Sequence, residues 1–212
     1  MKRYLLLFVL VLVSMPVNAG KQKVYQHDKV LCNEDRSLCT DKNKKPITGM
    51  VETIRSGRRT ISMEYKKGKV EGKRIMYSSD GIHPILEMTW VNGKLDGITR
   101  TYWNDTHTIK GEKVWYNGNP IGKSVRYYKN GKKQFIVNND SSEFKFFDRN
   151  GQLFATFDQN GITCHNNKEA RNATDEQKLS KLISFFDEQD KAAMDPNVLF
   201  DTEEHDFTFL CE

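Results

Sequence analysis

Residues 64–77 read EYKKGKVEGKRIMY, residues 89–102 read TWVNGKLDGITRTY, and residues 114–127 read VWYNGNPIGKSVRY. These three units follow one another at a constant interval and align on two glycines that stand four positions apart. An aromatic residue lies three positions before each first glycine, and a tyrosine lies five positions after each second one. The aligned positions are Gly68, Gly93 and Gly118; Gly72, Gly97 and Gly122; Tyr65, Trp90 and Trp115; and Tyr77, Tyr102 and Tyr127. A repeat of this length predicts an array of small units that bury their apolar faces against their neighbours.

Each unit is predicted to form a strand, a tight turn and a second strand. Apolar and polar residues alternate before the turns, as at Ile61, Met63 and Tyr65, and this period of two is typical of a half-buried strand. Asn92-Gly93 and Asn117-Gly118 tolerate the positive φ angles that a two-residue hairpin turn requires. The sequence therefore predicts a mainly β protein with one elongated antiparallel sheet of consecutive β-hairpins.

Weaker copies of the repeat extend the array, which we place at residues 49–165. Gly49 stands almost one full repeat before Gly72, and decayed copies follow at residues 130–137, 144–154 and 154–161. The third unit has Pro120-Ile121 before its second glycine, where the first two have an apolar residue and an acid. We expect the register to be less regular from this point onward.

The recurring pattern Y-x-x-G-K-x-x-G-x-x-x-x-Y, with a further Asn-Gly or Asp-Gly at the next turn, resembles the variant MORN repeat. Over about residues 47–161 the chain is similar to the YwqK-type antitoxin and immunity group, which is built from such repeats. The resemblance implies a sheet of MORN-like hairpins and an antitoxin that neutralises a toxic protein.

Residues 1–19 have the pattern of a secretory signal peptide that is cleaved after Ala19. Lys2 and Arg3 precede an apolar run from Leu5 to Val13, and small residues lie at the cleavage point. The run is too short to span a membrane, and an uncleaved anchor is the alternative. We therefore expect a periplasmic protein.

Four cysteines in an exported chain predict two disulfides, for which three connectivities exist. Cys32 and Cys39 are close in sequence, and Cys164 and Cys211 flank the C-terminal segment, so we expect these two pairs. A metal site formed by Cys32, Cys39, His27 and a distant residue is the alternative, but it lacks the short paired spacing of a structural zinc site. No metal or other cofactor is expected.

The two ends of the mature chain are predicted to cap the array. Residues 20–48 form an N-terminal cap segment, in which Val24, Tyr25, Val30 and Leu31 could add a strand pair against the first hairpin. In residues 166–212, a capping box at 174–177 and apolar residues at Leu179, Leu182, Ile183 and Phe186 predict one amphipathic helix as a C-terminal cap. The residues around Phe207 and Leu210 are predicted to form a short closing strand.

Charge divides the mature chain into a basic array and an acidic tail. Residues 20–165 hold 26 lysines and arginines against 16 aspartates and glutamates, which gives +10. Residues 166–212 hold 5 against 12, which gives −7. The two parts could attract one another, or the basic sheet could face an acidic partner.

The chain lacks the sequence motifs of the common enzyme classes. We find no G-x-S-x-G, no H-E-x-x-H and no phosphate-binding glycine loop, and hairpin turns account for the glycines. The five histidines lie in turns or polar segments, and residues 203–206 are interpreted as a solvated charged loop and not as a metal cluster. We therefore expect a protein that is not an enzyme. An enzyme that uses free cysteines is a third alternative.

The resemblance and the signal peptide together predict a periplasmic immunity protein. Its partner would be a protein effector whose active site it blocks, such as a type VI secretion phospholipase or another envelope-targeting toxin. The alternative is an envelope scaffold or a MORN-repeat module that contacts anionic lipid weakly. No nucleic-acid partner is expected, and an open edge strand could support a homodimer.

The candidate contact residues follow from strand alternation. If Tyr77, Tyr102 and Tyr127 face the core, then Trp103 and Tyr128 face the other way. Aromatic residues and arginines dominate the binding energy of interfaces. The predicted partner-binding residues are Trp103, Tyr128, Arg74, Arg126, Lys73 and Lys123. The opposite assignment, with Trp103 inside and Tyr102 outside, remains open because both faces carry aromatic residues.

Overall fold

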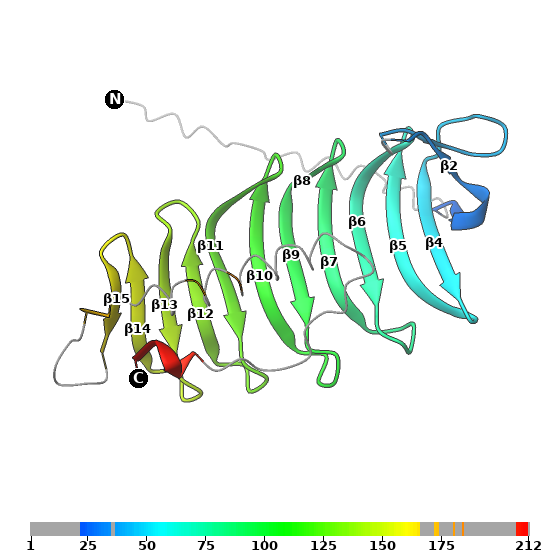
Figure 1. The fold of residues 1–212 in the computed structure, drawn as a ribbon. Coiled ribbons are helices and arrows are strands. Elements are labelled where there is room, and N and C mark those ends of the chain that lie inside the picture. Colours follow the sequence, from blue (N-terminus) through cyan, green and yellow to red (C-terminus); the bar gives the residue numbers. More distant parts are fainter. Residues whose placement is uncertain are drawn as a thin grey trace, which may run out of the picture.

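A computed structural model describes residues 22–34, 37–165, 172–173, 180, 184 and 207–211 of the 212-residue chain. Within these residues the protein is mainly β, and consecutive strands lie side by side in one long sheet (Figure 1). Fourteen described strands form this sheet. They are β1 (Val24–Gln26), β4 (Gly49–Arg55), β5 (Arg58–Lys66), β6 (Lys69–Tyr77), β7 (Pro84–Val91), β8 (Lys94–Leu95), β9 (Gly97–Tyr102), β10 (Ile109–Tyr116), β11 (Asn119–Tyr127), β12 (Lys133–Asn138), β13 (Glu143–Phe147), β14 (Leu153–Asp158), β15 (Gly161–Cys164) and β16 (Asn172–Ala173).

The order of strands in the sheet follows the order of the chain, as the prediction of consecutive hairpins requires. One pair differs, because β1 lies parallel to β4, so the sheet is mixed and not purely antiparallel. The predicted N-terminal strand pair is also divided. Strand β1 joins the long sheet, whereas β2 (Leu31–Cys32) pairs with β3 (Cys39–Thr40) in a separate ribbon that follows the 3-10 helix η1 (His27–Lys29).

The Asn-Gly turns have the predicted backbone conformation. Both residues of each turn have positive φ, 52° and 79° at Asn92 and Gly93 and 51° and 87° at Asn117 and Gly118. This combination matches the right-handed twist of the flanking strands, which is why it closes tight hairpins. Lys67 takes the same conformation in the first unit, with a φ of 52° before Gly68.

In the first two units, the second glycine lies directly opposite an aromatic residue of the next strand. Gly72 pairs with Trp90, and Gly97 pairs with Trp115 in the same way. A side chain at Gly72 would meet the Glu64 carboxylate, since a Cβ there would lie 1.9 Å from Glu64 Oε2. The glycine and aromatic columns therefore recur together in the sequence because they form cross-strand pairs.

The sheet has two chemically different faces, which the strand register identifies. We call them the apolar face and the polar face. A row of paired residues, one per strand from β5 to β15, crosses the apolar face: Ile61, Met76, Leu86, Thr101, Gly111, Arg126, Phe135, Phe146, Ala155 and Cys164. The neighbouring row on the polar face is Ser62, Ile75, Glu87, Arg100, Glu112, Val125, Ile136, Lys145, Thr156 and Thr163.

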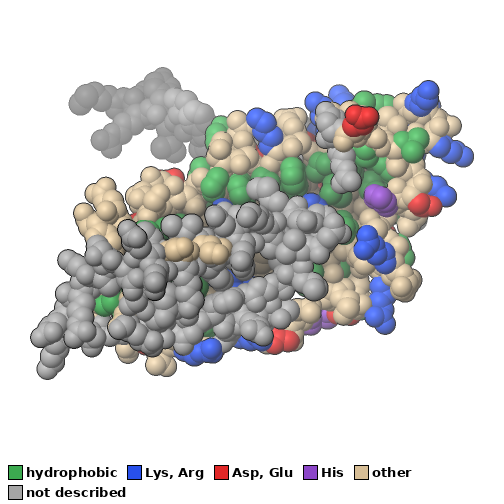
Figure 2. All heavy atoms as spheres, viewed as in Figure 1, with side chains coloured by type: hydrophobic (Ala, Val, Ile, Leu, Met, Phe, Trp, Pro, Cys, Tyr) green, Lys and Arg blue, Asp and Glu red, His purple; other side chains and the backbone are tan. Residues whose placement is uncertain are grey.

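The buried hydrophobic residues gather mainly on the apolar face. One cluster around Leu86 and Met88 lies on the middle strands, and another around Phe146 lies at the C-terminal end of the sheet. Figure 2 shows hydrophobic side chains gathered over the middle strands in the view of Figure 1. The core of this protein is thus spread along one side of a single sheet.

The structure confirms both expected disulfides, Cys32–Cys39 and Cys164–Cys211. Two intramolecular disulfides suggest an oxidising environment outside the cytoplasm. Thr208–Cys211 forms the 3-10 helix η2, so the closing strand predicted there is wrong. Its neighbour Phe207 is buried against Phe135 and Phe146, with ring centroids 5.8 and 5.4 Å away, and these contacts bring the C-terminal end back to the apolar face.

Two other predicted segments lie outside the described residues. These are the signal peptide at 1–19 and, apart from residues 180 and 184, the amphipathic helix after the capping box at 174–177. Among the described residues, no helix combines the length and the apolar character needed to cross a membrane.

Candidate functional site

Three of the six predicted contact residues are buried. Trp103, Tyr128 and Arg126 are 1%, 4% and 6% exposed. The expectation that they face solvent is therefore wrong, and the alternative that placed Trp103 inside is correct. Strand β9 ends at Tyr102 and β11 ends at Tyr127, and the register shifts between residues 126 and 127. Alternation itself holds at these positions, because Trp103 and Tyr128 lie on the opposite face to Tyr102 and Tyr127, and the error was in taking the tyrosine face as the core.

Trp103 lies among positively charged side chains from the next two strands. Its ring centroid is 4.7 Å from Lys110 Nζ and 5.7 Å from Arg126 Cζ. The Lys129 ammonium lies 5.3 Å from the same ring and forms an ion pair with Asp105. Such cation–π contacts stabilise a desolvated aromatic ring. The arrangement makes Trp103 part of the packing between successive hairpins.

The other three predicted residues have different positions. Arg74 is half-buried and pairs with Met63 and Met88 on the apolar face. Lys73 and Lys123 are exposed on the polar face. The structure thus leaves only these two lysines, among the six, in the exposed position that the prediction required.

The tyrosine column lies on the polar face, where each hydroxyl forms a hydrogen bond with a residue of the preceding, directly paired strand. Tyr77 contacts Ser62 Oγ at 3.1 Å, Tyr102 donates to Glu87 Oε2 at 3.0 Å, and Tyr127 donates to Glu112 Oε2 at 3.4 Å. These three partners also occupy equivalent positions in successive repeats. The expectation that the tyrosines share the core face is wrong, because their side chains are half-buried over the polar row.

Glu112 links three strands on the polar face. It accepts a hydrogen bond from Arg100 Nε at 2.9 Å as well as the bond from Tyr127. The bond to Glu112 raises the pKa of Arg100. Burial raises the pKa of Tyr127, and the nearby Glu112 charge adds to this effect.

Tyr102 should make the folded protein sensitive to alkaline pH. Burial, together with the bond to Glu87, raises the pKa of Tyr102 from 10.0 to about 12. A group whose pKa is raised in the folded state contributes stability below its unfolded pKa and loses that contribution as the pH rises through the folded value. We expect the urea midpoint to fall between pH 10 and pH 12, and to fall less in Tyr102→Phe. The exposed Tyr116→Phe serves as the control and should follow the wild type, whereas equal falls in all three proteins would contradict this origin.

An exposed group of hydrophobic side chains lies on the polar face of β9, β10 and β11. We call Ile98, Val114, Tyr116 and Ile121 the apolar strip. Val114 pairs with both Ile98 and Ile121, and Tyr116 follows two positions along β10 on the same face. Ile98 and Ile121 are each 40% exposed and Tyr116 is 65% exposed. Isolated exposed hydrophobics are common, whereas a contiguous group makes this part of the sheet a candidate interaction site.

The loss of an acid in the third repeat contributes to this strip. In the first two units the acid before the second glycine binds the next turn, since Glu71 accepts from the Asn92 amide at 2.7 Å and Asp96 from the Asn117 amide at 3.1 Å. Ile121 occupies the corresponding position in the third unit. There the bond is reversed, because Asp140 of the following turn accepts from the Gly122 amide at 3.1 Å. The exchange frees this position for an exposed hydrophobic residue.

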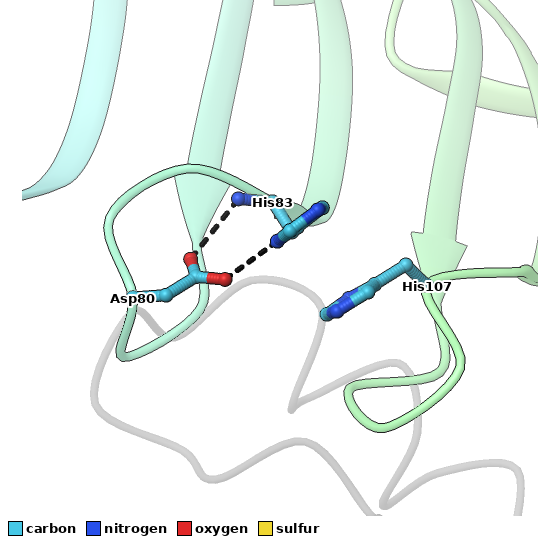
Figure 3. A group of neighbouring side chains, drawn as sticks. All are labelled: Asp80, His83 and His107. Carbon is cyan, nitrogen blue, oxygen red and sulfur yellow. Dashed lines mark hydrogen bonds and ion pairs between the residues drawn. The ribbon is translucent and has the colours of Figure 1, made fainter.

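A second group of side chains that could have a function lies in the loops at the opposite ends of the strands. Asp80 and His83 follow β6, and His107 follows β9 (Figure 3). Asp80 Oδ2 lies 2.5 Å from His83 Nδ1, and the His83 and His107 rings stack with centroids 3.8 Å apart. The hydrogen bond from His83 is the largest cause of a lowered pKa at Asp80.

The sequence analysis predicted neither the apolar strip nor the group formed by Asp80, His83 and His107. His107 falls one position short of a full repeat after His83. Residues separated by one repeat lie on adjacent hairpins, so this spacing was a usable signal. The apolar strip carried a weaker signal, because its members occupy different columns of the repeat.

The fold defines the chain as a repeat protein built from a single sheet of β-hairpins. Comparison with models of known protein families finds no match, and no curated protein matches the chain.

Proposed function

We propose that this protein is a periplasmic immunity protein of the YwqK-type MORN-repeat group, which binds a toxic protein effector and blocks its active site. The observation that supports this proposal best is the exposed apolar strip on the polar face of the sheet. The candidate effector is an envelope-targeting toxin, such as a phospholipase of a type VI secretion system. Two disulfides and the signal-peptide pattern of residues 1–19 support export.

The strip combines the features of a protein-binding surface. Tyr116 supplies a large side chain with few rotatable bonds, and aromatic anchors of this kind contribute much of the energy of interfaces. Lys123 lies two positions beyond Ile121 on the same face, and Lys73 lies on a neighbouring hairpin. A hydrophobic centre with basic residues nearby suits a partner that presents apolar side chains beside carboxylates.

The sheet also favours tight docking on physical grounds. Its strands are held by hydrogen bonds to both neighbours, so little conformational entropy is lost when a partner binds. The charge-paired polar row, with Arg100 bound to Glu112, fixes the side chains next to the strip. A rigid surface of this kind can cover the entrance to an active site.

The test uses the product of the reading frame adjacent to this one, exported to the periplasm of a bacterial host. Its expression should stop growth, and co-expression of this chain should restore it. The double variant Ile98→Asp/Tyr116→Asp should bind the purified product at least tenfold more weakly, because two carboxylates would be buried against an apolar surface. Calorimetry measures the affinity, and circular dichroism checks that the variant is folded.

The control is Ile82→Asp, at a position that is 69% exposed and lies in the β6–β7 loop, away from the strip. It should bind like the wild type. If the double variant also binds like the wild type, the strip is not the contact surface. If the wild type neither binds nor protects, the immunity function itself is wrong. Binding to vesicles of anionic phospholipid that is lost at moderate salt would then favour the membrane-associated alternative.

A further inference from the structure

We infer that His83 and His107 bind a divalent transition-metal ion of the Zn²⁺ type, and that Asp80 orients His83. The candidate ligand atoms of the three residues all lie within 4.8 Å of one another. His83 belongs to the loop between β6 and β7, and His107 belongs to the loop between β9 and β10 (Figure 3). A bound ion would therefore connect two successive hairpins.

Asp80 is held in place by its own loop. Its Oδ1 accepts hydrogen bonds from the Ser78 hydroxyl at 2.5 Å, the Ile82 amide at 2.7 Å and the His83 amide at 3.1 Å. These bonds position Oδ2 against the ring of His83. The carboxylate is thus a fixed part of the loop, whether or not an ion is bound.

This geometry selects one tautomer of His83. An ionised carboxylate only accepts hydrogen bonds, so Nδ1 of His83 must donate to Asp80. In the neutral ring the lone pair then lies on Nε2, on the side away from Asp80. A carboxylate that holds the non-coordinating nitrogen of a histidine is the common outer contact of zinc-binding imidazoles.

His107 supplies the second imidazole. Its ring lies parallel to that of His83, with 8° between the planes. Lone pairs in parallel planes do not converge, so one ring must turn about its side-chain bonds before both can bind the same ion. Two nitrogens at about 2.1 Å from a tetrahedral Zn²⁺ are roughly 3.4 Å apart. The ring centroids are 3.8 Å apart, so rotation of the two loop side chains can bring the nitrogens to that distance. Water would complete the coordination.

The ligand chemistry distinguishes between ions. Two imidazole nitrogens suit Zn²⁺, Cu²⁺ and Ni²⁺, whereas Mg²⁺ and Ca²⁺ prefer sites made of oxygen ligands. The side chains of His83 and Asp80 are 46% and 38% exposed, so an ion can reach them from solution.

The experiment titrates ZnCl₂ into the EDTA-treated full chain by calorimetry. We expect one equivalent to bind, and saturating zinc to raise the Tm by about 3 °C through selective binding to the folded state. His107→Ala should abolish both effects. It leaves the Asp80 loop unchanged but removes the ring that stacks on His83, so the effect of zinc is measured as the difference in Tm between the zinc-bound and metal-free forms of each protein. MgCl₂ should give neither effect.

Two matched variants control for other histidines. His27→Ala lies in η1, and His205→Ala lies outside the described residues; both should bind zinc like the wild type. The proposal is overturned if the wild type shows no saturable binding, if His107→Ala keeps the wild-type affinity, or if His205→Ala loses the site. None of these outcomes depends on the toxin-binding proposal, because no effector is present.

Discussion

Replacing both Cys164 and Cys211 with alanine should lower the free energy of unfolding by about 4 kcal/mol. This disulfide closes a loop with a sequence separation of 47. In the chain-entropy model, a loop of that length restricts the unfolded chain enough to give a stabilisation of roughly 4 kcal/mol. The bond also ties η2 to β15, where Phe207 and Leu210 complete the C-terminal cluster. Urea denaturation monitored by circular dichroism measures the change.

The second disulfide provides a control within the same chain. Cys32–Cys39 has a sequence separation of only 7, for which the same model gives roughly 2 kcal/mol. We expect its alanine double variant to lose about half as much stability as the first. Equal losses from the two variants would show that loop length does not set the effect, and that local packing at each bond does.

Phe146→Ala should lower the free energy of unfolding by about 3 to 5 kcal/mol, as is usual for the removal of a fully buried phenylalanine. Its side chain is 0% exposed. Its ring contacts Phe135, Phe154 and Phe207, with centroid distances from 5.4 to 6.5 Å. The substitution leaves a cavity where the sheet and the C-terminal end of the chain meet, and the rigid sheet backbone limits how far the site can collapse.

The adjacent residue is a matched control, because Phe147→Ala removes the same atoms from a half-buried position. The Phe147 carbonyl accepts a hydrogen bond from the Tyr128 hydroxyl at 2.8 Å, and this bond remains when the side chain is shortened. We expect less than half the loss seen for Phe146→Ala. A larger loss at Phe147 would mean that the core lies on the other side of β13.

The repeat itself allowed much of the fold to be predicted. Turn chemistry is local, so Asn92-Gly93 and Asn117-Gly118 predicted their hairpins without knowledge of the rest of the chain. The glycine and aromatic columns predicted the order of the strands, because residues one repeat apart must occupy equivalent positions on neighbouring hairpins. The disulfide pairs followed from sequence separation and were confirmed.

The repeat did not show which face of the sheet is the core. Both faces of the strands carry aromatic residues, so alternation leaves two assignments open. The register shifts at Tyr77 and Tyr127 place the extra residue on the next strand, so β6 and β11 keep their own alternation. The buried residues identify the face opposite the tyrosine column as the core, so Trp103 and Tyr128 are part of the packing and not of an open surface.

The sequence by itself determined that this protein is a β-hairpin array, since its turns and its repeat length act through local geometry. Only the tertiary structure decided which side chains are exposed, because both faces of the strands carry aromatic residues and the packing determines which face is covered. The meeting of His83 with His107 is likewise a tertiary feature. The two loops are almost one full repeat apart in the sequence. They lie side by side only after the strands between them have paired.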